Sequence, residues 1–91
     1  ADEELRAQVL TSDALDILAD FKARAEKLDD WSVDTLASTI KDTLNEKGVK
    51  MPALGIPIRV ATTGQKQTPS VDAVLALLGR DVVLERLNQV L

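Results

Sequence analysis

The segment LGIPIRVATTG, Leu54 to Gly64, decides whether the chain is entirely helical or contains a strand. Its β-branched residues at positions 56, 58 and 60 alternate with other residues, and this period of two favours a strand on local rules. A single strand would have no partner, however, since every other segment has a helical pattern. Pro57 fits the first turn of a helix and Gly64 fits its end. The sequence therefore predicts a short helix that begins near Pro57.

Outside this segment, apolar residues recur every three or four positions, which is typical of amphipathic helices. One helix follows Ser12 or Asp13 as N-cap, and a second runs from Ser32 as N-cap to Gly48. A short helix that ends at Gly79, a last helix after it and one at the N-terminus complete the set. Loops are predicted around residues 48–56 and 64–69. The prediction is a compact all-α bundle of five to six short helices, with residues 1–91 as one domain.

The composition excludes several kinds of chemistry. The 91 residues include no cysteine and no histidine, so disulfides, thiolate metal sites and the commonest general base are absent. The glycine spacing matches no nucleotide-binding loop. Acidic residues such as Asp13, Asp16, Asp20 and Asp34 fall on solvent faces or first helical turns. We therefore expect a domain with no catalysis, metal or cofactor of its own.

Two further features of the sequence concern the cellular location of the protein and its relation to a longer chain. No apolar run approaches the roughly 20 residues that a membrane helix needs, so we expect a cytoplasmic protein without a membrane partner. The chain lacks an initiator methionine and opens in a helical pattern, so we expect it to be a fragment of a longer enzyme.

The charge is unevenly distributed along the chain. The net charge is −4, yet residues 47–71 carry four bases and no acid. A polyanion responds to the local field within a Debye length of about 10 Å, so the average charge does not exclude nucleic acid. The four bases are Lys47, Lys50, Arg59 and Lys66.

Each candidate residue also has a purely structural interpretation. Arg59 could extend out of an apolar face or contact a ligand, and the residues alone leave both open. Thr68 as N-cap and Pro69 at the first helical position would start a helix whose free N–H groups can also receive a phosphate or a base. Lys47 and Lys50 flank a helix C-terminus, where cations are stabilised whatever the function.

Trp31 is the only tryptophan. It could stack on a base, but it directly precedes the N-cap Ser32 and can pack on Leu36 as a hydrophobic staple, which is the favoured interpretation.

Several segments together resemble the C-terminal end of bacterial glutamyl-tRNA synthetase. They are LGIPIRVATTG at 54–64, Thr68-Pro69, VLALLGR at 74–80 and VLERL at 83–87, and Trp31-Ser32 followed by a helix is similar as well. The resemblance implies an all-helical domain that grips the tRNA anticodon loop, far from the aminoacylation site. The family's catalytic signatures are absent, so the ATP that the resemblance implies belongs to the parent enzyme and not to this fragment.

The resemblance also implies roles for individual residues. Arg59 would read a base edge or stack on a base, and residues Thr68, Pro69, Ser70 and Val71 would offer a backbone and apolar surface to a splayed base. Lys66, and after it Lys50 and Lys47, would contact phosphate. Many relatives have glycine where this chain has Thr68, which puts the loop shape and the base preference in question.

Two alternatives to an RNA-binding domain remain at this stage. A helical protein-interaction or dimerisation module would have apolar faces larger than a 91-residue core can hide. An acidic carrier protein would need an attachment serine after an aspartate at a helix start, whereas this chain has Ser12 before Asp13. We expect a monomer whose partner is the tRNA anticodon loop.

Overall fold

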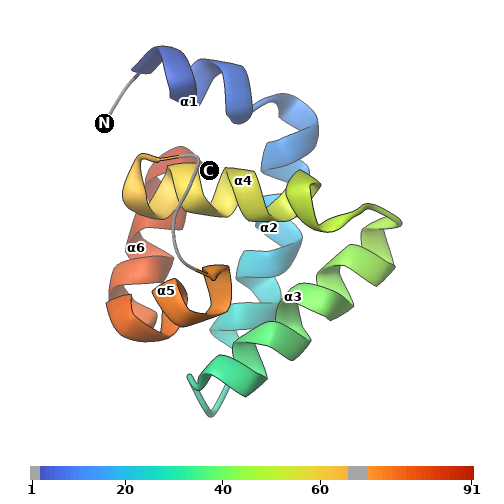
Figure 1. Cartoon of the computed structure of the whole chain (residues 1–91), viewed down its shortest axis with the longest axis vertical. Helices are drawn as coiled ribbons and strands as arrows, with labels where there is room; N and C mark the ends of the chain where they lie inside the picture. The colour runs from blue at the N-terminus through green and yellow to red at the C-terminus, as the bar shows by residue number, and fades with distance from the viewer. Residues whose placement is uncertain (1–2, 66–69) are drawn as a thin grey trace.

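The structure is a computed structural model that describes residues 3–65 and 70–91. Those residues form six α-helices and no strand, which confirms the all-α prediction. Figure 1 shows their order in the chain. The helices are α1 (Glu3–Val9), α2 (Ser12–Glu26), α3 (Val33–Lys47), α4 (Met51–Thr63), α5 (Val71–Leu78) and α6 (Arg80–Val90).

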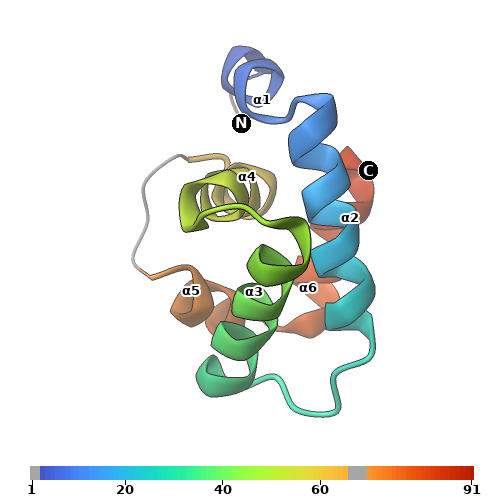
Figure 2. The same ribbon diagram turned by 90° about the vertical axis from the view of Figure 1, so that its right-hand side faces the viewer.

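The helices enclose one apolar core. Figure 2 shows α3, α4 and α5 on one side of the molecule, α2 and α6 on the other, and α1 across one end. The largest fully buried side chains come from five of the helices and include Phe21, Leu36, Ile58, Leu75 and Leu87. Helices α2 to α6 thus depend on one another for burial, and α1 mainly adds a cover over α4.

Helix α4 differs from the prediction at its start. It begins at Met51, six residues before Pro57, so the predicted loop at 48–56 is wrong over most of its length. Pro52 occupies the first turn, where a missing N–H costs nothing, and Pro57 lies in the helix interior. The lost hydrogen bond at Pro57 is offset because Leu54 and Ile58 are almost fully buried on the same helix. The predicted end at Gly64 is confirmed, with φ of 76°.

The other helix ends are partly as predicted. Ser32 caps α3 by accepting a hydrogen bond from the Thr35 N–H at 3.2 Å, and Gly48 ends it. Helix α2 is capped by Thr11, whose hydroxyl accepts from the Ala14 N–H at 3.3 Å, so the predicted caps Ser12 and Asp13 are wrong by one and two positions. The reason is that Ser12 already has helical geometry.

Helix α5 begins at Val71 with Ser70 as its N-cap residue, later than the predicted start at Pro69. Thr68 and Pro69, for which a cap and a first helical position were predicted, lie outside the described residues.

Three side chains join elements that are distant in sequence. The Trp31 indole N–H donates to the Leu75 carbonyl at 2.8 Å, which holds the α2–α3 loop against α5. Trp31 also packs on the core cluster that contains Leu36. Arg80 donates to the carbonyl of Glu26, the last residue of α2, and to that of Leu28 just after the helix. Arg86 donates to the Thr62 carbonyl at the end of α4. Two arginines of α6 therefore satisfy carbonyls that a helix end leaves unpaired.

No helix in residues 3–65 or 70–91 is long and apolar enough to cross a membrane.

Candidate nucleic-acid interface

Arg59 lies on α4 and is half-buried. Its guanidinium folds back along the helix, because Nη1 lies 3.2 Å from the point where a Cβ on Gly55 would sit. The Cε atom of Met51 lies 3.2 Å from the same point. The two side chains therefore both reach the space over Gly55, and residues 51, 55 and 59 form one line along the helix. A glycine at position 55 gives the guanidinium room to lie against the helix.

The start of α5 provides the second part of the predicted site. Ser70 is exposed, and its side chain makes no capping hydrogen bond. Val71 is 3% exposed and belongs to the core, so only its backbone can face a ligand. In the first turn, one carboxylate oxygen of Asp72 accepts a hydrogen bond from the Ala73 N–H at 2.8 Å.

The predicted lysines have different surroundings. Lys47 donates to the Asp16 carboxylate at 2.9 Å, which joins α3 to α2 and raises the pKa of Lys47. Lys50 is exposed at the N-cap position of α4, close in sequence to Met51. Lys66 lies outside the described residues. The structure therefore leaves Lys50 solvent-accessible beside α4 and engages Lys47 in an ion pair.

A small pocket connects these elements. Its volume is about 200 Å³, and it lies where α3 meets the starts of α4 and α5. We call it the α3/α4/α5 pocket; its lining residues are Ala37, Ile40, Lys41, Leu44, Met51 and Asp72. Met51 lines this pocket and also reaches the space over Gly55 that the Arg59 guanidinium shares, so Met51 connects the pocket with the Arg59 region.

Sequence reasoning missed three residues of this region: Lys41, Met51 and Asp72. In the sequence, Ala37, Ile40 and Leu44 recur at helical spacing in the segment after Ser32, and Lys41 follows Ala37 by four positions. Their meeting with Met51 and Asp72 depends on the packing of three helices, which no local pattern reveals.

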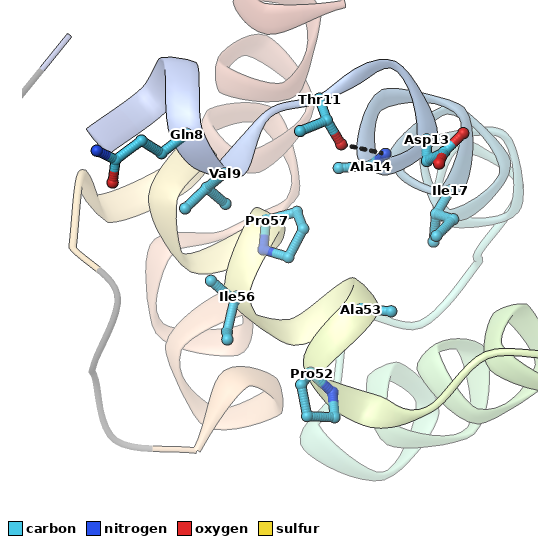
Figure 3. Close-up of a pocket in the computed structure, with 10 residues that line it drawn as sticks. All are labelled: Gln8, Val9, Thr11, Asp13, Ala14, Ile17, Pro52, Ala53, Ile56 and Pro57. Carbon is cyan, nitrogen blue, oxygen red and sulfur yellow. Dashed lines mark hydrogen bonds between the residues drawn. The ribbon is translucent and has the colours of Figure 1, made fainter. Parts of the chain in front are cut away.

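A larger cavity of about 370 Å³ lies between α1, the start of α2 and α4. Figure 3 shows Val9, Ile17, Ile56 and Pro57 among its mainly apolar lining. It contains no arginine or lysine, so it has no cation that could hold a phosphate.

Among the residues that the structure describes, no three Asp or Glu side chains gather in a way that could hold a metal ion.

A family model and the sequences of known proteins both relate this chain to the same group of proteins. A family model described as "Anticodon binding domain" matches residues 1–91. The chain is 53% identical over 91 residues to the glutamate–tRNA ligase of Bordetella avium. This alignment covers 100% of the chain and 19% of that relative. It is 54% identical over 87 residues to that of Bordetella petrii, and 46% identical over 88 residues to that of Thiobacillus denitrificans. These two alignments cover 96% and 97% of the chain, and 18% of each relative. The chain thus spans less than a fifth of the length of these relatives.

Proposed function

Because the chain belongs to the family of anticodon binding domains, we propose that it recognises the anticodon loop of a transfer RNA as part of a glutamate–tRNA ligase. In this proposal the domain positions the RNA, and a catalytic part outside this chain performs the ATP-dependent aminoacylation. The chain itself contributes binding and no catalytic group. A cytoplasmic location and a monomeric state belong to the same proposal.

The observation that carries the proposal is the position of Arg59. Arg59 is half-buried, and its guanidinium shares the space over Gly55 with Met51, which lines the α3/α4/α5 pocket. Single-stranded RNA is read by planar guanidinium groups and apolar surfaces that accept unstacked bases. Arg59 supplies the first of these and the pocket beside it supplies the second.

Contacts to phosphate would complete the interface. Lys50 is exposed at the start of α4, and Lys66 follows the end of the same helix in sequence. Phosphate contacts set the position of the RNA, whereas Arg59 would distinguish bases. The backbone from Thr68 to Val71 would face a splayed base. Lys47 would contribute only if RNA competes with Asp16 for its ammonium group.

The test is a titration of this chain with an RNA hairpin that reproduces the anticodon arm of a glutamate tRNA. We expect Arg59→Ala to weaken binding by about 1–3 kcal/mol, the range for a bidentate base contact. Arg24→Ala is the matched control, because it removes the same charge from α2, where Arg24 is paired with Asp20 at 3.1 Å. Equal affinities for the Arg59→Ala and Arg24→Ala variants would refute the role of Arg59.

One observation supports the alternative of a protein-interaction module. Leu77 on α5 is 88% exposed, and the cavity of about 370 Å³ is mainly apolar. Such surfaces can mark protein interfaces. The anticodon proposal expects a single species in sedimentation velocity over a wide concentration range. A sedimentation coefficient that rises with concentration, and returns to the monomer value in Leu77→Ser, would favour the alternative.

A further inference from the structure

The α3/α4/α5 pocket has the form of a small apolar slot with one charge of each sign. Ala37, Ile40, Leu44 and Met51 supply its apolar wall, and the pocket also includes Lys41 and Asp72. Its volume of about 200 Å³ is below the roughly 300–1,000 Å³ typical of pockets for drug-sized ligands. Space of this kind suits one planar ring with polar edges rather than a complete nucleotide.

The pocket is continuous with the surface on which the proposed function depends. Met51 is 39% exposed, and its Cε and Arg59 Nη1 each lie 3.2 Å from the place that a Cβ on Gly55 would take. On the other side, Asp72 directly follows Val71, the last residue of the segment expected to face a base. An RNA strand held between Arg59 and the start of α5 would therefore pass the opening of this pocket.

From this arrangement we propose that the α3/α4/α5 pocket receives one unstacked nucleobase that carries an exocyclic amino group. The inference rests on the proposed function, since it requires RNA on this surface. The base lies against the apolar wall, where the Met51 thioether makes a favourable contact with an aromatic ring. The Asp72 carboxylate accepts a hydrogen bond from the amino group, as acidic side chains do with cytosine N4. Lys41 donates to a base carbonyl or to the adjoining phosphate.

The charged groups of the pocket argue for a base over other apolar occupants. An aliphatic side chain of a protein partner would fill the wall without forming hydrogen bonds to Asp72 or Lys41, whereas a base can form hydrogen bonds to both. Uracil has a carbonyl where cytosine has the amino group, so its oxygen would face the Asp72 carboxylate. The pocket should therefore distinguish these two pyrimidines.

Methyl NMR can locate the base directly. Met51 is the only methionine of the chain, and Ile40 also lines the pocket. Addition of the anticodon-arm hairpin should produce ring-current shifts at the Met51 and Ile40 methyl groups. Ile17 and Ile56 line the larger cavity and serve as internal controls, whose methyl signals should stay in place. The expected shifts should disappear in Ala37→Leu, which fills the pocket from an exposed position on α3.

Base preference tests the role of Asp72. Hairpins in which each loop base is changed in turn to cytosine or uracil should reveal one position that prefers cytosine. We expect a preference of about tenfold or more there, as for a hydrogen bond to a charged group, and its loss in Asp72→Asn. Asp81→Asn is the control, because Asp81 lies in the first turn of α6 as Asp72 lies in the first turn of α5. A weakening by Asp72→Asn that is equal for cytosine and uracil would overturn the role of Asp72.

The outcomes separate this inference from the proposed function. If the hairpin binds with the same affinity after Arg59→Ala, both proposals fail. If binding depends on Arg59 but the Met51 and Ile40 methyl groups do not respond, only the pocket proposal fails. Methyl shifts that appear at high protein concentration without RNA would identify a second copy of the chain as the occupant, and would also overturn it.

Discussion

Gly55 is a residue whose missing side chain matters to the candidate interface. It lies in the interior of α4, where glycine is normally unfavourable, and both Arg59 Nη1 and Met51 Cε come within 3.2 Å of the position that its Cβ would take. Both neighbours are ends of flexible side chains, so they can move aside at little cost. Gly55 therefore sets the place of the Arg59 guanidinium more than it sets the stability of the helix.

This gives opposite expectations for stability and binding. Gly55→Ala should stabilise the chain by about 0.5–1 kcal/mol, because alanine loses less backbone freedom in a helix. The same substitution should weaken binding of the anticodon-arm hairpin several-fold, because it displaces Arg59 and Met51. Urea denaturation and RNA titration of the same samples measure the two effects.

Gly48→Ala is the control for this pair of measurements. Gly48 has a φ of 65°, and no atom lies within 4 Å of the place that a Cβ would occupy, so alanine there strains the backbone without touching Arg59. We expect lower stability and unchanged RNA affinity. If Gly55→Ala left RNA binding intact, the guanidinium would not need its present position.

At the scale of a single element, the start of α3 shows how a helix end acquires a dependence on pH. The hydroxyls of Ser32 and Thr35 each donate to Asp30 Oδ2 at 2.6 Å. These hydrogen bonds favour the charged carboxylate and hold the pKa of Asp30 below its ordinary value of 3.8. The loop that leads from Trp31 into α3 is thus tied to an ionised group.

The sign of the pH effect follows from the lowered pKa. The stabilisation by Asp30 is present above the unfolded-state pKa and is lost as the pH falls through the lower, folded-state pKa. The free energy of unfolding of the wild type should therefore approach that of Asp30→Asn as the pH drops below 3.8. Urea denaturation at a series of pH values measures both curves. Asp29→Asn, at the exposed neighbouring position, should not reproduce this convergence, and parallel wild-type and Asp30→Asn curves would exclude the proposed origin.

Helix ends also show where sequence patterns suffice and where they do not. Gly48 and Gly64 were correctly predicted as ends, because a positive φ is a local requirement that glycine meets. The start of α4 was predicted wrongly. The preference of proline for the first turn of a helix placed the start near Pro57, whereas the helix begins at Met51 and buries Leu54. Local rules consider a few neighbours, whereas the core decides how far an apolar segment stays helical.

Across the whole molecule, the formal charge does not show which Lys and Arg side chains are available to contact RNA. Arg80 and Arg86 donate to backbone carbonyls, and Lys47 is paired with Asp16, 31 residues away in sequence. None of these partners can be deduced from composition or spacing. The all-α class was predicted from sequence patterns, and the proposed role of Arg59 came from a family resemblance, but the α3/α4/α5 pocket depends on how three helices pack.

The two arginines of α6 also have a bearing on how this domain is made. Arg80 reaches back across the fold to the α2–α3 junction, and Arg86 reaches back to the last turn of α4. During translation both of those earlier segments leave the ribosome before the side chains that complete them. The earlier helices therefore lack these stabilising hydrogen bonds until α6 has been synthesised, so we expect the domain to fold as one cooperative unit only after α6 has left the ribosome.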